Sequence, residues 1–237
     1  MRPTIVLVHG AFAESASWDG VVDPLLAAGH DVVAAANPLR GLAADAQSVS
    51  DVVRAIEGPV VLVAHSYGGA VISNVDPDAG EIVGLVYVAA FAPDAGESCF
   101  GLSTRFPGST LGDALEAIPR SDGTTDLRIR KERFHSQFCA DVPPEQAARM
   151  AVSQRPVTQE ALQEPSGDSP LWRDRPSSFL IATEDRNIPA DVQRFVAERA
   201  GARRMLEIAG ASHAAAVSQP GAVADLILEA ARLPAAA

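Results

Sequence analysis

Pro59-Val-Val-Leu-Val-Ala-His-Ser-Tyr-Gly-Gly-Ala-Val-Ile72 joins a buried strand to a helix through a sharp turn. Residues 59–64 form a nearly unbroken run of β-branched and aliphatic side chains, which is typical of a parallel strand covered on both faces. Gly68 and Gly69 indicate a tight turn directly afterwards, and the residues that follow continue as a helix. The stretch therefore predicts a strand, a turn and a helix, with Ser66 at the turn.

Ser66 lies in the pattern Ala64-His65-Ser66-Tyr67-Gly68, which resembles the G-x-S-x-G turn that exposes a nucleophilic serine. Alanine replaces the first glycine, and the crowded turn accepts it because the side chain is very small. Such a turn lifts the serine hydroxyl clear of the sheet. It also points the N–H of Tyr67 to where an oxyanion would form. A serine that only caps a helix N-terminus is the alternative.

The composition is that of a globular protein. At 237 residues the chain is long enough for one large α/β domain, or for one domain with an inserted cap. Thirty acidic residues against nineteen basic residues give a net charge of −11. No cluster of lysine and arginine could follow a phosphate backbone, so we expect no nucleic-acid partner.

The first apolar run, residues 4–8, is too short for a secretory signal and ends at His9-Gly10 without a cleavage pattern. No stretch approaches the length of a membrane span, so we expect a cytoplasmic protein without a membrane partner. Cys99 and Cys139 are the only cysteines. Without a secretory signal, free thiols are expected rather than a disulfide.

Strands and helices alternate in the first part of the chain and again near its end, which predicts a parallel sheet with right-handed crossovers. The fold class is therefore α/β, a mostly parallel sheet of about six strands with helices on both faces. Strands are expected over residues 4–8, 31–35, 59–64, 81–90, 177–182 and 203–208. Helices are expected over residues 17–29, 42–57, 70–74, 190–200 and 220–232.

Residues 92–176 show no strand pattern, and such a long interruption predicts an inserted helical cap on a core formed by residues 1–91 and 177–237. Its helical pieces are expected over 127–138, 144–152 and 157–163. A cap would exclude water and supply apolar walls for a ligand. The expected wall residues are Phe12 from the core and Phe134, His135, Phe138, Met150 and Trp172 from the cap. Those from the cap could equally pack within it.

Three further candidates follow strands, at the edge of a parallel sheet where ligands bind. The N–H of Ala11 is the candidate for a second oxyanion donor. Asp185 comes directly after a strand and is the expected acid, with Glu184 as its neighbour and Asp94 as the alternative. His213 lies on a loop of small residues after the last strand, where an imidazole can reach Ser66.

The chain order serine, acid, histidine is the order of the α/β-hydrolases. The sequence resembles this superfamily over its full length, and within it the small capped esterase branch that includes plant hydroxynitrile lyases and salicylate-type methyl esterases. The segments that carry the resemblance are Ile5-Val-Leu-Val-His-Gly-Ala-Phe12, Val61-Leu-Val-Ala-His-Ser-Tyr-Gly-Gly69, Asp185-Arg-Asn-Ile-Pro189 and Gly210-Ala-Ser-His213.

The resemblance implies a role for each group. Ser66 would be the nucleophile, His213 the general base and then acid, and Asp185 the group that holds the imidazole tautomer. The N–H groups of Ala11 and Tyr67 would stabilise the tetrahedral oxyanion. This chemistry requires no cofactor and no metal, and the histidines and acids show no metal-ligand spacing.

Two positions favour hydrolysis over cyanohydrin cleavage. Hydroxynitrile lyases of this type carry a threonine at the position of Gly10 and a lysine at that of Ala214, so a cation for departing cyanide is missing here. We therefore expect a carboxylic ester hydrolase that forms an acyl-enzyme on a small apolar ester. Another acyl transfer, a lyase or cofactor-free oxidative enzyme on the same scaffold, and a ligand-binding protein that retains the triad are the alternatives.

Overall fold

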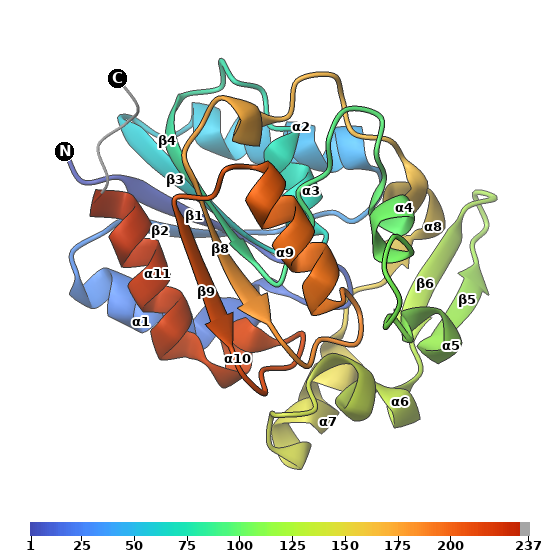
Figure 1. Cartoon of the computed structure of the whole chain (residues 1–237). Coiled ribbons are helices and arrows are strands. Elements are labelled where there is room, and N and C mark those ends of the chain that lie inside the picture. Colours follow the sequence, from blue (N-terminus) through green and yellow to red (C-terminus); the bar gives the residue numbers. More distant parts are fainter. Residues whose placement is uncertain (233–237) are drawn as a thin grey trace.

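The computed structural model describes residues 1–232, and a six-stranded parallel sheet with the order β2-β1-β3-β4-β8-β9 runs through its centre (Figure 1). All neighbouring strands in it are parallel. This confirms the predicted α/β fold class. The strands are β1 (Thr4–Val8), β2 (Val32–Ala35), β3 (Pro59–His65), β4 (Glu81–Val88), β8 (Ser177–Ala182) and β9 (Arg204–Ile208).

Helices cover both faces of the sheet because successive side chains of a strand point to opposite sides. In β1, Ile5 and Leu7 belong to the apolar cluster that includes residues of α1 and α11, whereas Val6 and Val8 belong to the cluster that includes α2, α3 and α9. The helices are α1 (Asp19–Ala27), α2 (Leu42–Arg54), α3 (Gly68–Ser73), α9 (Ala190–Arg199) and α11 (Pro220–Arg232). The predicted core range extends to residue 237, and its residues 233–237 lie outside the described part.

The ends of some elements differ from the predicted ones. The first helix is preceded by a 3₁₀ turn, η1 (Ser15–Trp18), and α2 ends at Arg54 rather than at Glu57. A short helix, α10 (Ala215–Ser218), also separates β9 from α11. None of these differences moves a strand out of the sheet.

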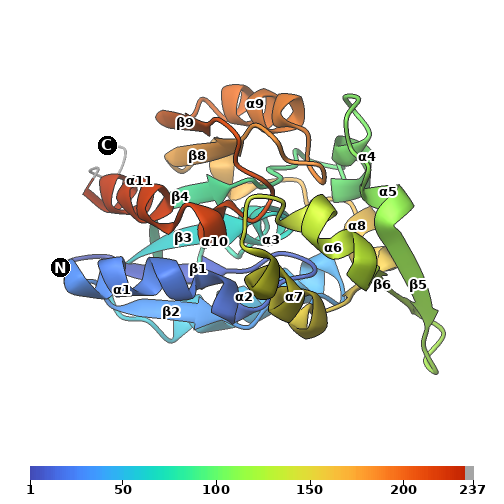
Figure 2. The same ribbon diagram turned by 90° about the horizontal axis from the view of Figure 1, so that it is seen from below.

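Most of the inserted segment, residues 92–176, lies at the end of the sheet opposite the N-terminus, beyond the carboxyl ends of the strands, and its last residues return to the start of β8 (Figure 2). The prediction that it contains no strand is wrong, because β5, β6 and β7 form an antiparallel three-stranded sheet. Its elements are α4 (Cys99–Ser103), α5 (Leu111–Ala114), β5 (Leu115–Pro119), β6 (Thr125–Ile129), α6 (Lys131–Phe138), α7 (Pro144–Ser153), β7 (Val157–Thr158), α8 (Gln159–Gln163) and η2 (Leu171–Arg173).

The β5–β6 hairpin, which was not predicted, is favoured by its turn sequence and by a contact with a distant part of the chain. Asp122-Gly123 is a common hairpin turn, and Gly123 has a φ of +87°. In β6, Asp126 is 7% exposed and accepts hydrogen bonds from Arg40 at 2.6 Å and Arg120 at 3.0 Å. Because Arg40 lies in the loop between β2 (Val32–Ala35) and α2 (Leu42–Arg54), this carboxylate ties the small sheet to the part of the chain that forms the parallel sheet. Residues 127–129 are strand rather than the predicted helix.

Cys99 and Cys139 are free and buried, which confirms the expectation of unpaired thiols. Burial raises the pKa of the Cys99 thiol, and burial with the nearby Asp141 carboxylate raises the pKa of Cys139 to about 12. Both thiols are therefore protonated at neutral pH. No helix within residues 1–232 combines the length and apolarity needed to cross a membrane.

Candidate active site

Ser66 lies at the turn between β3 and α3 in a left-handed conformation, with a φ of +56° that is uncommon for residues other than glycine. Positions 68 and 69, which follow Tyr67, must be glycine because the backbone there packs closely against the backbone of other segments. A Cβ at Gly68 would lie 2.6 Å from the carbonyl oxygen of Val8, and one at Gly69 would lie 2.1 Å from that of Phe91. The turn thus holds Ser66 above the carboxyl ends of β1 and β3.

A continuous chain of hydrogen bonds joins Ser66, His213 and Asp185. His213 Nδ1 lies 2.7 Å from Asp185 Oδ2, and His213 Nε2 lies 2.9 Å from Ser66 Oγ. A carboxylate only accepts, so Nδ1 carries the proton and Nε2 accepts from the serine hydroxyl. The side chains of His213 and Asp185 are 1% and 0% exposed. This arrangement can remove the proton of Ser66 as its oxygen attacks an electrophile.

The Asp185 carboxylate is held by groups near it in the chain. Oδ1 accepts the N–H groups of Asn187 at 2.7 Å and Ile188 at 2.9 Å, and Oδ2 accepts Gln193 Nε2 at 2.9 Å. With the bond to His213, four donors converge on one buried carboxylate. Its orientation is thus fixed before any substrate binds.

Asp94, the alternative acid, pairs with Arg173 rather than with His213. Its carboxylate accepts a hydrogen bond from Arg173 and forms an ion pair with it. Partial burial raises the pKa of Asp94, but the Ala95 N–H and Arg173 outweigh burial and lower this pKa overall. Asp94 therefore has a charged partner of its own, whereas Asp185 contacts His213.

His65 contacts both the backbone and the ring of His213. Its Nε2 donates to the backbone carbonyl of His213 at 2.9 Å, and the two rings lie 4.6 Å apart. Burial, and then the proximity of His213, lower the pKa of His65 well below its usual value, so the ring is neutral at physiological pH. Nothing in the sequence around His65 predicted this contact, because its partner lies 148 residues away in the chain.

The loop after β1 contacts Ser66 directly. A Cβ built at Gly10 would lie 2.6 Å from Ser66 Cβ and 2.8 Å from the His65 carbonyl oxygen. Only glycine fits this contact without displacing the backbone. The close approach brings the Ala11 N–H next to Ser66.

Two backbone N–H groups beside Ser66, those of Ala11 and Tyr67, have no hydrogen-bond acceptor within residues 1–232. Ala11 is 3% exposed and Tyr67 is 0% exposed. Buried N–H groups without an acceptor are rare in folded proteins. The next N–H along the loop, that of Phe12, donates to the Arg155 carbonyl at 3.1 Å. The two unpaired groups are thus available to an oxygen atom of a ligand.

The predicted wall residues have different positions. Phe138 lies edge-on to the His213 ring at 5.0 Å, and Phe134 stacks on Phe138 at 5.0 Å. Trp172 is buried and its Nε1 donates to the Pro93 carbonyl at 2.8 Å. None of these three aromatic residues lines the two cavities described next, so their contact with a ligand stays a prediction.

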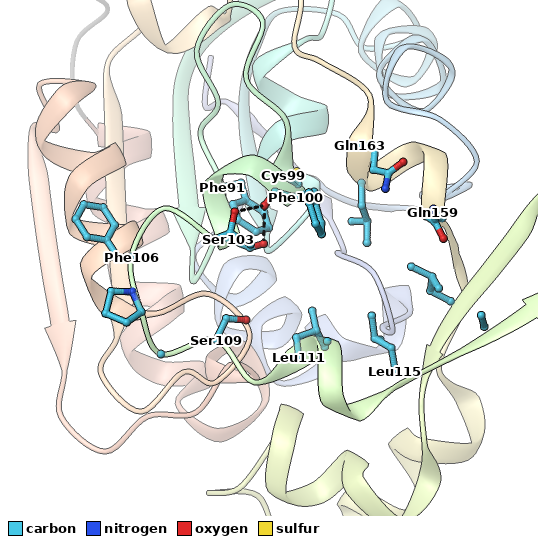
Figure 3. A pocket seen from close by; sticks show the side chains of 17 residues that line it. Phe91, Cys99, Phe100, Ser103, Phe106, Ser109, Leu111, Leu115, Gln159 and Gln163 are labelled. Carbon is cyan, nitrogen blue, oxygen red and sulfur yellow. Dashed lines mark hydrogen bonds between the residues drawn. The ribbon is translucent and has the colours of Figure 1, made fainter.

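A cavity of about 750 Å³ is lined by residues of the inserted segment, with Phe91 as the one lining residue from outside residues 92–176 (Figure 3). Phe91 is part of its wall, and the Phe91 N–H donates to the Ser66 carbonyl at 3.2 Å. None of its side chains is charged. Its lining residues are Phe91, Cys99, Phe100, Ser103, Thr104, Phe106, Pro107, Gly108, Ser109, Leu111, Gly112, Leu115, Ala117, Leu127, Gln159, Leu162 and Gln163. A smaller cavity of about 390 Å³ has a more polar wall that includes Phe12, Glu14 and Arg149.

Residues 5–226 match the family described as alpha/beta hydrolase. The chain belongs to this family. Within residues 1–232 of this hydrolase, no group of three or more histidine, cysteine, aspartate or glutamate side chains is placed to hold a metal ion.

Relatives of this hydrolase match over nearly their whole length. A pyrethroid hydrolase of Sphingobium wenxiniae is 30% identical over 254 residues, covering 98% of this chain and 88% of that protein. Salicylic acid-binding protein 2 of Nicotiana tabacum is 27% identical over 250 residues, covering 94% and 95%. The crystal structure of polyneuridine aldehyde esterase has a TM-score of 0.81 at 21% identity, with 97% and 99% coverage, and so shares the fold.

Sequence reasoning missed Gln193, which holds the Asp185 carboxylate of this hydrolase in place. Its Oε1 accepts the N–H of Ala182 at 3.0 Å, and its Nε2 donates to both Asp185 and the Ile188 carbonyl. A signal was present, because Gln193 shares the buried face of α9 with Val196. A polar residue on an apolar helix face requires a buried partner.

Proposed function

We propose that this alpha/beta hydrolase is a carboxylic ester hydrolase with Ser66 as nucleophile. The observation that supports the proposal most strongly is the hydrogen-bonded chain from Asp185 through His213 to Ser66, beside two N–H groups without acceptors. A serine hydroxyl is a poor nucleophile until an adjacent base takes its proton, and an oxyanion needs preorganised donors. Both requirements have a candidate group at this site.

In the proposed reaction, Ser66 Oγ attacks the ester carbonyl carbon while its proton passes to His213 Nε2. Asp185 stabilises the imidazolium, and the N–H groups of Ala11 and Tyr67 bind the oxyanion. Collapse of the tetrahedral intermediate breaks the bond to the alcohol, which leaves with the proton from His213. Water then attacks the acyl-enzyme and gives a proton to His213 Nε2, and collapse of the second tetrahedral intermediate returns this proton to Ser66 Oγ as the acid is released.

We further propose that the inserted segment, residues 92–176, acts as a cap and that the larger cavity holds the apolar part of a neutral small-molecule ester. Phe91 connects this cavity to the nucleophile, since its N–H is bonded to Ser66 and its side chain lines the wall. The uncharged lining favours neutral groups over charged ones, because a buried charge without a partner is costly. The names of the relatives, a pyrethroid hydrolase and methylesterases among them, support an ester substrate.

Cyanohydrin cleavage has weaker support. A threonine at position 10 would place its Cβ within 2.6 Å of Ser66 Cβ in this backbone, and Ala214 provides no cation beside His213. The site thus favours hydrolysis, which needs a proton donor to the leaving alcohol and no fixed positive charge.

The proposal is tested with p-nitrophenyl esters from acetate to dodecanoate, with a cyanohydrin assayed alongside. We expect a burst of p-nitrophenol equal to the enzyme concentration, followed by steady turnover. We also expect kcat/KM to increase beyond acetate, because longer acyl chains bury more apolar surface in the larger cavity. Cyanide release without ester turnover would instead indicate a lyase. Binding of esters without a burst would indicate a ligand-binding protein.

Gly10→Ala is expected to lower kcat about 100- to 1,000-fold, comparable to the loss of one oxyanion donor. The added methyl group would collide with Ser66 Cβ and move the Ala11 N–H away from the oxyanion. Gly221→Ala is the matched control, since a Cβ there has no neighbour within 4 Å. Equal rates for both variants and the wild type, measured as ester turnover, would contradict the assignment of Ala11.

A further inference from the structure

His9 has a single tautomer in the loop that precedes Ala11. The backbone N–H of Asn37 donates to His9 Nε2 at 3.1 Å, so Nε2 carries no proton. The proton of the neutral ring is therefore on Nδ1, which donates to the Gly10 carbonyl at 2.9 Å. Burial lowers the pKa of His9, which keeps the ring neutral, and both His9 and Asn37 are 0% exposed.

The carbonyl that His9 binds belongs to the peptide unit of the candidate oxyanion donor. Gly10 C=O and Ala11 N–H are parts of one planar trans peptide, and they point in opposite directions from it. A hydrogen bond that holds the carbonyl on one side therefore directs the N–H to the other side. Gly10 has no side chain to restrict its backbone, so without this hydrogen bond the peptide could rotate.

The rest of the loop is held on both sides of this peptide. Asn37 Nδ2 donates to the His9 carbonyl at 3.0 Å, so one asparagine binds both the ring and the backbone of His9. On the other side, the Phe12 N–H donates to the Arg155 carbonyl at 3.1 Å. Between these points, the bond from the His9 ring is the one that sets the direction of the Gly10–Ala11 peptide.

We propose that His9 is a positioning residue, held in its Nδ1–H form by Asn37, that orients the Ala11 N–H toward the oxyanion formed at Ser66. The proposal rests on the proposed ester hydrolase function. His9 does not touch the reacting atoms, and its effect passes through the peptide that it binds. Catalysis should therefore depend on the donor at the Nδ1 position.

Two variants distinguish the contribution of the Nδ1 donor from that of the other atoms of the His9 ring. In His9→Asn, the amide nitrogen can occupy the position of Nδ1 and donate to the Gly10 carbonyl. In His9→Gln, the amide reaches the position of Nε2 and can accept from Asn37, but no donor replaces Nδ1. His30→Asn is the matched control, because the His30 Nδ1 also bonds a backbone carbonyl, that of Pro3 at 2.8 Å, before the start of β1.

We expect His9→Gln to lower kcat about 10- to 100-fold, a part of the loss that follows removal of an oxyanion donor, with KM little changed. Inhibition by an alkyl trifluoromethyl ketone, which forms a tetrahedral adduct with a nucleophilic serine, should weaken by the same factor. Inhibition by the corresponding methyl carbinol, which forms no oxyanion, should not change. His9→Asn should retain most of kcat and of the ketone affinity, and His30→Asn should match the wild type.

The outcomes distinguish this inference from the function on which it depends. If the Ser66→Ala variant binds the ketone as tightly as the wild type does, both the role of His9 and the proposed hydrolase function are overturned. Tight, Ser66-dependent ketone binding that His9→Gln leaves intact would overturn the role of His9 alone. If both His9→Asn and His9→Gln lose kcat and ketone affinity equally, and the losses parallel a lower Tm, His9 has only a structural role. This result would also overturn its role in positioning the Ala11 N–H.

Discussion

Ser66→Ala is expected to lower kcat for p-nitrophenyl esters about 10⁵- to 10⁶-fold and to abolish the p-nitrophenol burst. Without Oγ no acyl-enzyme can form. His213 Nε2, which lies 2.9 Å from Ser66 Oγ in the wild type, loses the hydroxyl from which it accepts a hydrogen bond and has only water to activate. Residual turnover above the buffer rate would come from the oxyanion donors and from binding alone. The fold should persist, because the change removes one oxygen atom from a turn held by glycines.

Ser136→Ala is the control for this variant, since Ser136 is exposed on α6 and its hydroxyl donates only to the Arg133 carbonyl. Circular dichroism and thermal unfolding establish that both variants are folded. Mass spectrometry after a fluorophosphonate treatment should show one adduct on the wild type and on Ser136→Ala, and none on Ser66→Ala. A burst that survives in Ser66→Ala would remove Ser66 from the role of nucleophile.

Asp185→Asn is expected to lower kcat about 10⁴-fold while the protein stays folded. Two backbone N–H groups, those of Asn187 and Ile188, bind Oδ1, so the amide oxygen of an asparagine would take that position. Its NH₂ group would then face His213 Nδ1, which must accept rather than donate. The ring would carry its proton on Nε2 and could no longer take the proton of Ser66.

Asp94→Asn tests the alternative acid under the same conditions. It removes one partner of a partly exposed ion pair with Arg173, which is worth little in free energy. We expect its kcat to equal that of the wild type within about twofold, because surface changes of this kind have small effects. If Asp94→Asn lost activity and Asp185→Asn did not, the assignment of the acid would be reversed.

Local patterns in the sequence predicted the six parallel strands, the turn at Ser66 and the places where Asp185 and His213 follow strands. These features depend on neighbours in the chain: buried strands require continuous apolar runs, and the turn requires small residues beside the serine. The edge of a parallel sheet then brings the loops together. The three side chains do meet there, at 2.7 and 2.9 Å.

Only the tertiary structure showed how these groups are held. The β5–β6 hairpin forms where no strand was expected, and Asp126 in it pairs with an arginine 86 residues away in the chain. His65 binds a carbonyl 148 residues away, and Asn37 selects the tautomer of His9 across 28 residues. A pattern of a few residues carries no information on such partners, because the energy of each bond depends on which distant group the fold places beside it. The sequence by itself therefore determined the architecture and pointed to the candidate reacting groups, and the folded chain decided how these groups are oriented and what shape the cavity has.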